Sequence, residues 1–179
     1  DLIFNVKETE KLFVEKINIY GNNITRENVI RNNLEIDEGD PFNKILQLKS
    51  ENNLKNLKFF SSVSSDILDG SNENSKIINI KVEEKPTGEI SAGAGAGTSG
   101  GLFNFGVKEN NYLGKGLGLN AKATITSESF KGIFSIVNHN FNNSDKSIFG
   151  NVQAIEIDRK ATNGYKTNKT GFEVGTNSE

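Results

Sequence analysis

The spacing of apolar residues changes part-way along the chain. From residue 11 to residue 85, some segments carry the two-residue period of strands and others the three-to-four-residue period of helices. After Pro86, apolar residues alternate with glycine or polar residues in short segments that have almost no helical period. Of the 18 glycines, 3 precede Pro86 and 15 follow it. The pattern predicts a small α+β domain followed by a β-meander or the wall of a β-barrel.

The first half predicts the element order strand, helix, helix, strand, strand. The predicted strands span residues 13–20, 59–68 and 76–84, and the predicted helices span residues 26–33 and 44–56. Thr25 is expected to cap the first helix and Asn43 the second, because their side-chain oxygens can accept from free amides of the first turn. The apolar stripe of the second helix is expected at Ile45, Leu46, Leu54 and Leu57. A three-stranded sheet covered on one face by two helices would bury these stripes.

The second half predicts six strands. They span residues 88–97, 102–108, 117–126, 130–138, 148–158 and 169–175. The segment from Leu117 to Thr126 alternates most regularly, with apolar side chains on one face and polar residues or glycine on the other. Such a strand suits a membrane barrel, although the apolar face could also point into a soluble sandwich. Because a transmembrane barrel needs about eight strands or more, we expect the sheet to continue beyond Glu179.

Composition narrows the possible functions. The net charge of −2 and the calculated pI of about 5.6 give no strong positive field, which argues against nucleic acid as a partner. The absence of cysteine and the single histidine exclude disulfides, thiolate chemistry and multi-histidine metal sites in this stretch. No apolar run reaches the roughly 18 to 20 residues of a membrane-spanning helix, so membrane entry would require a closed barrel. The chain opens without a signal peptide, and we expect it to be an internal piece of a longer one.

Three apparent catalytic or cofactor signals fail in their context. Residues 95–100 match the dinucleotide-binding glycine pattern, but a strand rather than a helix follows them. Glu83 and Glu84 are neighbours on a predicted strand and point to opposite faces, so they cannot serve one reacting bond. His139 has neither a cysteine nor a second histidine to act with. We therefore expect no enzymatic activity, no cofactor and no metal.

The first ten residues resemble the end of the α+β domain. Residues 3–8 and 78–84 both alternate and end in acidic residues, and Glu8 lies 76 residues before Glu84. This distance suits one compact repeat, so residues 1–10 are expected to close a preceding copy. Chance similarity of two strands is the alternative.

Several motifs carry a family resemblance. They are Ile19–Asn22 followed by Thr25, Val29–Arg31, Glu38–Asn43, Leu57–Val63, Val82–Glu89 and Glu109–Gly116. In order and spacing they resemble the BamA family of outer-membrane protein assembly factors, from the last POTRA (polypeptide-transport-associated) domain into the first barrel strands. The likeness covers residues 1 to about 126 and weakens afterwards. Lys58 departs from the family, which usually has glycine there, and the family's arginine-bearing loop motif lies outside this sequence.

The resemblance implies a domain organisation and a function. Residues 1–10 would end a preceding POTRA repeat, residues 11–87 would form a POTRA domain (β-α-α-β-β), and residues 88–179 would begin an antiparallel transmembrane β-barrel. The protein would fold and insert β-barrel proteins in the outer membrane, with the POTRA domain in the periplasm. Its partners would be unfolded outer-membrane proteins, accessory lipoproteins and outer-membrane lipid. The alternatives are a POTRA-containing secretion pore or translocation-and-assembly relative, and a soluble surface β-protein.

Two strands are candidate sites. The first predicted barrel strand carries alanine and glycine where strands prefer β-branched or aromatic residues, so its side-chain pairing should be weak and its backbone could template a client strand. This seam comprises Gly88, Glu89, Ile90, Ser91, Ala92, Gly93, Ala94 and Gly95. The resemblance also places a POTRA edge strand at Phe60, Val63, Asp66 and Ile67. Alternatively, the glycines and alanines only permit close packing, and Ser61, Ser62, Ser64 and Ser65 blunt the edge.

Overall fold

The chain divides into two compact units. A computed structural model describes residues 11–97, 100–141, 144 and 146–178. One unit contains residues 11–23 and Asn33–Lys85, and the other contains Ile24–Asn32 and residues 86–178. The expected remnant of a preceding repeat, residues 1–10, lies outside the described residues.

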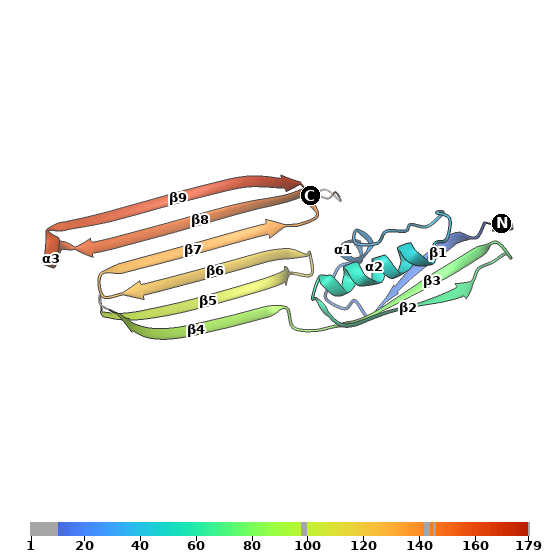
Figure 1. The fold of residues 1–179 in the computed structure, drawn as a ribbon, viewed down its shortest axis with the longest axis horizontal. Coiled ribbons are helices and arrows are strands. Elements are labelled where there is room, and N and C mark those ends of the chain that lie inside the picture. The colour runs from blue at the N-terminus through green and yellow to red at the C-terminus, as the bar shows by residue number, and fades with distance from the viewer. Residues whose placement is uncertain (1–10, 98–99, 142–143, 145, 179) are drawn as a thin grey trace, which may run out of the picture. The chain divides into compact units, whose positions relative to one another are not determined.

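The first unit is a three-stranded sheet with a helix packed on it (Figure 1). Its elements are β1 (Phe13–Tyr20), α2 (Lys44–Asn56), β2 (Phe60–Asp69) and β3 (Ser75–Glu84). The strand order is β1-β3-β2, with β1 parallel and β2 antiparallel to β3. The predicted order of strands and helices along the chain is confirmed. However, α1 (Glu27–Arg31) groups with the second unit, so only one helix belongs to the same unit as this sheet.

A β-bulge changes which residues of β1 face the core. The pairing register with β3 shifts between Val14 and Lys16. An extra residue at this point lets Val14 and Ile17 both be buried, although strict alternation would place them on opposite faces. Phe13 is consequently 42% exposed, and the expected alternation from residue 13 to 20 is wrong at its start.

The inward face of α2 is partly polar. Asn43 caps the helix as predicted, since its side chain accepts a hydrogen bond from the amide of Ile45 at 2.8 Å. Leu54 is buried as expected, but Ile45 is 74% exposed, and Gln47 and Ser50 occupy the buried face instead. The apolar spacing therefore indicated the wrong face for the first turn of the helix.

Hydrogen bonds explain how Ser50 is tolerated in this position. Its hydroxyl donates to the carbonyl of Leu46 at 2.9 Å and accepts from the amide of Glu35 at 2.7 Å. A buried hydroxyl that has both a donor and an acceptor does not carry the cost of an unpaired polar group. The apolar periodicity contains no trace of such partners.

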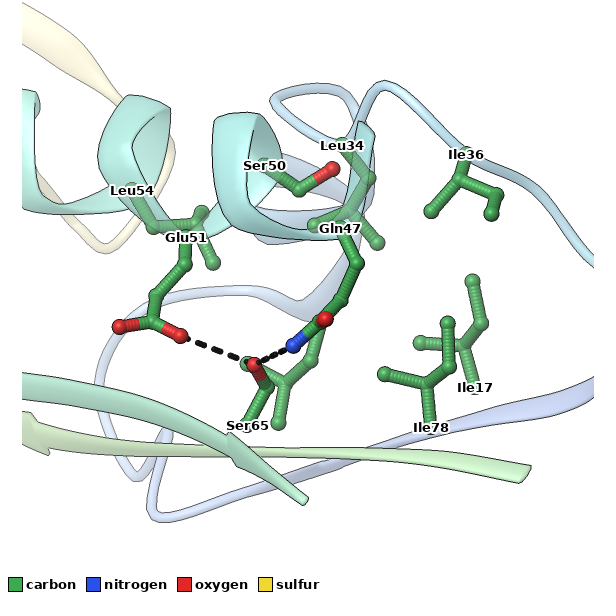
Figure 2. A pocket seen from close by; sticks show the side chains of 10 residues that line it. Ile17, Leu34, Ile36, Gln47, Ser50, Glu51, Leu54, Ser65 and Ile78 are labelled. Atoms are coloured by element: carbon green, nitrogen blue, oxygen red, sulfur yellow. Dashed lines mark hydrogen bonds between the residues drawn. The ribbon is translucent and has the colours of Figure 1, made fainter. Parts of the chain in front are cut away.

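A short polar chain crosses the interface between α2 and β2 (Figure 2). The Gln47 amide Nε2 donates to the Ser65 hydroxyl, which donates to Glu51 Oε2 at 2.9 Å. Lys55 also donates to Glu51, at 2.6 Å. Burial raises the pKa of Glu51, but the hydrogen bonds from Lys55 and Ser65 and the charge of Lys55 together outweigh burial and lower it. Glu51 is thus held as a carboxylate beside the apolar core.

A lysine occupies a backbone conformation that suits glycine. Lys58, between α2 and β2, has φ of 61°. This left-handed conformation crowds the Cβ atom of any L-residue. The turn geometry therefore agrees with a position where glycine would be unstrained.

The second unit is a six-stranded antiparallel meander (Figure 1). Besides α1 its elements are β4 (Gly88–Gly97), β5 (Gly100–Tyr112), β6 (Leu117–Thr126), β7 (Ser129–Asn138), β8 (Lys146–Arg159), α3 (Lys160–Asn163) and β9 (Tyr165–Ser178). Each strand pairs with the next in the chain. The six predicted strands are all present, several of them longer than expected, and α3 is an addition to the prediction.

The register of this sheet gathers most of its exposed large apolar side chains on one face, whereas Ile133, Phe149 and Ile155 lie on the other. Rows of directly paired residues run from strand to strand, for example Ala94 with Phe103 and Phe103 with Ile125. Exposed apolar residues on this face are Ile90, Phe103, Phe105, Val107, Ile125, Phe130, Phe134, Ile136, Val152, Phe172 and Val174. The opposite face carries Ser91, Asn104, Lys122, Thr124, Lys131, Asn151, Gln153, Lys169 and Glu173. The two faces of one sheet therefore suit different media.

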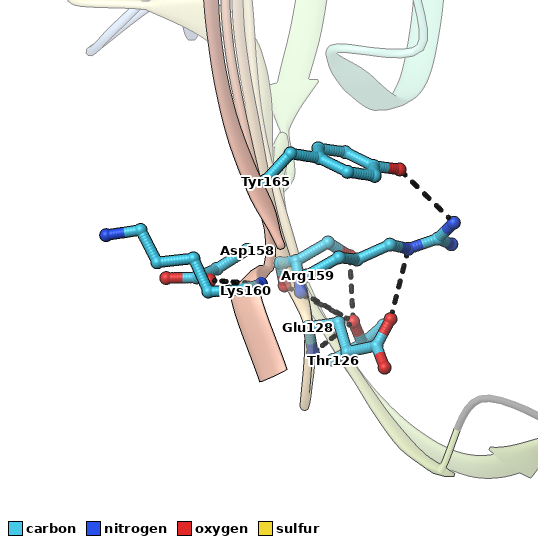
Figure 3. Close-up of polar contacts among 7 residues, drawn as sticks. Thr126, Glu128, Asp158, Arg159, Lys160 and Tyr165 are labelled. Carbon is cyan, nitrogen blue, oxygen red and sulfur yellow. Dashed lines mark hydrogen bonds and ion pairs between the residues drawn. The ribbon is translucent and has the colours of Figure 1, made fainter. Parts of the chain in front are cut away.

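Charged residues mark one end of the apolar face. Glu156 on β8 pairs directly with Phe130 in the last apolar row, and Asp158 and Lys166 follow that row. Lys166 lies 2.6 Å from Glu156. On the polar face at the same end, Arg159 donates to Glu128 at 3.1 Å and to the Tyr165 hydroxyl at 3.5 Å (Figure 3). These contacts join the β6–β7 turn to the hairpin that carries α3.

In the part of the chain that the structure describes, no helix has the length and apolar character needed to cross a membrane.

Replacing Glu51 by glutamine is expected to flatten the acid side of the pH dependence of stability in the first unit. Because its folded-state pKa is lowered, the Glu51 carboxylate contributes stability above its unfolded pKa, and this contribution disappears as the pH falls through the folded pKa. Urea denaturation of residues 11–87 from roughly pH 3 to pH 7 would measure this. Exposed Glu73, replaced in the same way, is the control. Parallel curves for wild type and Glu51→Gln would contradict the assignment.

Candidate functional site

All eight residues of the predicted seam lie on β4, at one border of the six-stranded sheet. Among the described residues β4 pairs only with β5, so its other edge has no strand beside it. Every residue of β4 is exposed. A border strand with free backbone donors and acceptors can accept a further strand by β-augmentation.

Side-chain pairing between β4 and β5 is uneven along the strand. At one end Ile90 pairs with Val107, and both side chains are large. At the other end Gly97 pairs with Gly100, which leaves only backbone hydrogen bonds. A good cross-strand pair contributes roughly 0.2–1 kcal/mol beyond an alanine pair, so glycine pairs forgo this contribution. Among the described residues, the end of β4 that precedes Gly100 therefore has the smaller side-chain pairs with β5.

The other end of β4, called the near end, is held by polar contacts with β5. The Thr87 hydroxyl donates to Glu109 Oε1, and the Thr87 carbonyl accepts from the Asn110 amide at 3.3 Å and from its side chain at 3.2 Å. Glu109 Oε2 lies 3.0 Å from where a Cβ atom of Gly88 would stand. These contacts hold Thr87, the residue before β4, against β5.

Sequence reasoning missed a buried asparagine next to these contacts. Asn111 is 5% exposed, and its Nδ2 donates to the Thr25 hydroxyl at 2.8 Å. Thr25 is therefore not the N-cap that we predicted: the N-cap is Arg26, with no side-chain cap. Because Thr25 and Asn111 are 86 residues apart, no local pattern could reveal the pair.

The turn between β5 and β6 holds the segment Ile24–Asn32, called the α1 segment below. The Arg26 amide donates to the Gly114 carbonyl at 2.9 Å. A Cβ atom on Gly114 would collide with the carbonyl oxygen of Ile24, and φ of Gly114 is 67°. Glycine is required here both for conformation and for close approach.

The second candidate strand, β2, is at one border of the three-stranded sheet. Phe60 and Val63 are buried and belong to the core, whereas Ile67 is 37% exposed. Asp66 pairs with Lys81 at 2.8 Å. The four predicted residues therefore share a strand, but only Asp66 and Ile67 present exposed side chains.

Two serine hydroxyls of β2 form hydrogen bonds within the first unit. Ser61 donates to the Glu83 carbonyl at 3.1 Å and Ser62 to its carboxylate at 3.1 Å. These bonds tie β2 to β3.

Across the residues that the structure describes, no three histidine, cysteine, aspartate or glutamate side chains gather in a group that could hold a metal ion.

Similarity to known proteins covers residues of both units. Residues 12–85 match the POTRA family model, described as a surface antigen variable number repeat. The chain is 28% identical to the outer membrane protein assembly factor BamA of Nitratidesulfovibrio vulgaris, over 84% of this chain and 19% of that protein. It is 36% identical to BamA of Neorickettsia risticii over 64% of this chain and 15% of that protein. With BamA of Neisseria meningitidis the identity is 27% over 95% of this chain and 22% of that protein.

A solved structure extends the likeness to the fold. BamA from Haemophilus ducreyi lacking POTRA domains 1–3 superimposes with a TM-score of 0.79 at 26% identity, covering 91% of this chain and 32% of that one. This chain is BamA-like. CdiB from Acinetobacter baumannii superimposes with a TM-score of 0.60 at 18% identity, over 93% of this chain and 33% of that one, and shows a shared fold alone.

The match identifies the architecture of the BamA-like chain. A POTRA fold precedes strands that correspond to part of a barrel wall, as the sequence predicted. The chain spans about a fifth of the length of the BamA proteins from N. vulgaris and N. meningitidis.

Replacing Gly114 by alanine is expected to destabilise the second unit more than replacing Gly164. Both glycines have positive φ, so each substitution costs about 1–2 kcal/mol of backbone strain. Only Gly114 adds a collision with the α1 segment, because the space around Gly164 is open. Thermal unfolding of the full-length protein in detergent would compare the two variants. Equal losses would show that the close approach to Ile24 does not exist.

Proposed function

We propose that the protein is a component of the machinery that folds and inserts β-barrel proteins into the bacterial outer membrane. The observation that carries this proposal is a meander with one continuous apolar face, bordered by a weakly paired strand and preceded by a POTRA fold. The names and folds of the BamA relatives support it. In the proposed role, a strand edge of the protein serves as a template on which a client strand pairs. This role needs neither a catalytic residue nor nucleotide hydrolysis.

The sheet β4–β9 would form part of the barrel wall in the outer membrane. Its exposed phenylalanine, isoleucine and valine side chains would contact lipid, and its lysine, asparagine and glutamate side chains would face water. The first unit would lie in the periplasm, where clients arrive. A soluble surface β-protein would need a second layer over the apolar face, and this requirement disfavours that alternative.

β4 is proposed as the strand that receives clients. Its free edge can bond a client strand through backbone amides and carbonyls, which accept any client sequence. Its glycine and alanine residues offer few side-chain contacts to any neighbouring strand, so exchanging one strand at the free edge for another would cost little. The eight seam residues Gly88–Gly95 would act through their backbone.

β2 is proposed as a second receiving edge, for extended clients or an accessory lipoprotein. It borders its sheet, and its backbone is free on one side among the described residues. The exposed Asp66 and Ile67 would add side-chain contacts.

A POTRA-containing secretion pore is the alternative within the same fold. The shared fold of CdiB from A. baumannii supports it, but at 18% identity that likeness concerns the fold only. The sequence similarity to assembly factors favours insertion of barrel proteins over secretion.

Cysteines placed on β4 are expected to capture a client strand. During assembly of a client that carries a cysteine on its terminal strand, Ser91→Cys and Ala94→Cys should form disulfide adducts because β4 has a free edge. Ala123→Cys on β6 is the matched control, since β6 is paired on both sides and Ala123 lies on the same face as Ala94. Adducts would be detected by a mass shift in non-reducing gels. No adduct at either β4 position, or equal capture at Ala123→Cys, would refute the seam.

Proline substitutions test the β2 edge. Neighbouring amides of a strand point in opposite directions, so one of Asp66→Pro and Ile67→Pro removes a donor from the free edge and the other removes one from the ladder with β3. The variant that stays folded by circular dichroism is expected to bind clients several-fold more weakly. The alanine variants at the same positions keep the amide and control for the side chain. Unchanged binding by the folded proline variant would count against this edge.

A further inference from the structure

We propose that Tyr112 and Leu113, where β5 turns into β6, hold this turn in the headgroup layer of the phospholipid leaflet on the periplasmic side of the outer membrane. The inference rests on the proposed function, because it takes β4–β9 to be part of a barrel wall in that membrane. It assigns a lipid contact to a turn at the end of the wall.

Leu113 occupies a turn position that usually carries a different residue type. The Tyr112 carbonyl accepts a hydrogen bond from the Lys115 amide at 3.1 Å, which closes the turn. The two central residues, Leu113 and Gly114, have φ of 54° and 67°. Tight turns with positive φ at both central positions favour asparagine, aspartate or glycine. A leucine there carries roughly 1–2 kcal/mol of backbone strain, so local turn chemistry does not account for it.

Packing within the described structure does not offset this strain. Leu113 is 63% exposed, and its neighbour Tyr112 is 43% exposed. Two such side chains can bury on the order of 300 Å², well below the roughly 800 Å² that each partner buries in a standard protein interface. The pair is therefore better suited to a lipid surface than to a folded protein partner.

The strand register places Tyr112 at the border of the apolar face. Tyr112 pairs directly with Leu117 on β6, which lies on the same face as Ile125. Unlike the apolar rows nearer the middle of the sheet, this row mixes apolar and polar members: Tyr112, Leu117, Asn138, Ile148 and Thr176. A mixed row suits the boundary between acyl chains and headgroups, where tyrosine is enriched because its ring is apolar and its hydroxyl polar.

Chain direction places this turn at the periplasmic end of the sheet. β4 begins at Gly88, shortly after the first unit ends at Lys85, and Gly88 pairs with Glu109 near the end of β5. The turn between β5 and β6 therefore lies at the end where the chain enters the sheet from the POTRA domain. Because that domain is periplasmic, this end of the wall would meet the periplasmic leaflet.

Hydrogen bonds order the turn before it meets lipid. The Asn111 carbonyl accepts from the Gly114 amide at 3.0 Å, and Asn111 Oδ1 accepts from the Gly116 amide at 2.7 Å. The Asn111 amide donates to Glu109 Oε1 at 2.7 Å. Surrounding contacts of this kind allow a strained residue to persist. A surface that is ordered in advance also loses little conformational entropy when it binds.

Lys115 gives the turn a charge that suits the same layer. Its side chain is exposed. A lysine at a membrane interface can extend its ammonium group to lipid phosphates while its aliphatic stem lies along apolar surface. Leu113, Tyr112 and Lys115 thus combine an apolar side chain, an amphipathic ring and a cation.

Quenching of a fluorophore by labelled lipid locates the turn. Leu113→Cys in the full-length protein would carry the fluorophore NBD, in vesicles of phosphatidylethanolamine and phosphatidylglycerol that contain nitroxide-labelled phosphatidylcholine. We expect a nitroxide near the headgroup to lower the fluorescence at least about twofold. Phe105→Cys, on the apolar face, should instead be quenched by a nitroxide deep in the acyl chain. Lys108→Cys is the matched control: it lies on the same strand but on the polar face, and neither nitroxide should quench it.

Lys115→Cys keeps the test decisive if Leu113→Cys does not fold. Because it lies in the same turn, it should also be quenched by the headgroup nitroxide, although less strongly than Leu113→Cys. Quenching no greater than that of Lys108→Cys at both positions would overturn the proposal.

Photo-crosslinking in cells distinguishes lipid from a protein occupant. Benzoylphenylalanine in place of Tyr112 is expected to form adducts with phospholipid, detected by the mass of the purified protein. A discrete adduct with another protein would overturn the lipid assignment.

The outcome is separable from that of the proposed function. If Phe105→Cys is quenched but Leu113→Cys and Lys115→Cys are not, the wall lies in lipid and only the assignment of the turn fails. If Leu113→Cys is quenched but Ala94→Cys captures no client, the lipid contact stands and the client role fails. If Phe105→Cys is not quenched either, the barrel-wall proposal fails together with this inference.

Discussion

The arrangement of the second unit depends on backbone pairing between strands that keep a two-residue period, apart from one bulge at the end of β5. Antiparallel register places each side chain beside one of the same face, so alternation that is regular in β5 and β6 and looser in β7 and β8 still produces one mainly apolar and one mainly polar surface. A one-residue slip of β5 would move Phe103 and Phe105 to the polar face. The bulge in β5 between Glu109 and Tyr112 lies at the strand end, where it bends the chain toward the turn without disturbing the rows.

The same dependence on backbone pairing explains the character of β4. A strand with large side chains would hold a neighbouring strand through side-chain contacts that are specific to that neighbour. With alanine and glycine, most of the attraction between β4 and β5 resides in hydrogen bonds that a different strand can reproduce. Low side-chain complementarity and a fixed near end are therefore compatible. In the proposed role, the first would allow strand exchange and the second would keep the register of β4.

The sequence predicted those elements whose causes are local. The bounds of β6 follow from strict alternation between residues 117 and 126, and the cap of α2 follows from Asn43. The missed features have distant causes. The β1 bulge depends on pairing with β3, and the inward face of α2 depends on hydrogen-bond partners from other elements.

The same distinction between local and distant causes applies to the candidate sites. The weakness of β4 is visible in its composition, because glycine and alanine lack the side chains that pair across strands. The burial of Phe60 and Val63 on β2 and the Thr25–Asn111 pair became evident only in three dimensions. The position of Lys58 illustrates an intermediate case: the departure from glycine is visible in the sequence, whereas the positive φ that makes it matter is not.

The grouping of residues 24–32 with the later strands has a practical consequence for dissecting the molecule. A cut at Pro86 would follow the change in composition, yet it would deprive the strand-rich piece of nine of its own residues. Asn111 would then be exposed to solvent, and its turn would have no helix to close it. The two units interleave along the sequence, so a fragment that is meant to keep the second unit whole must also supply residues 24–32.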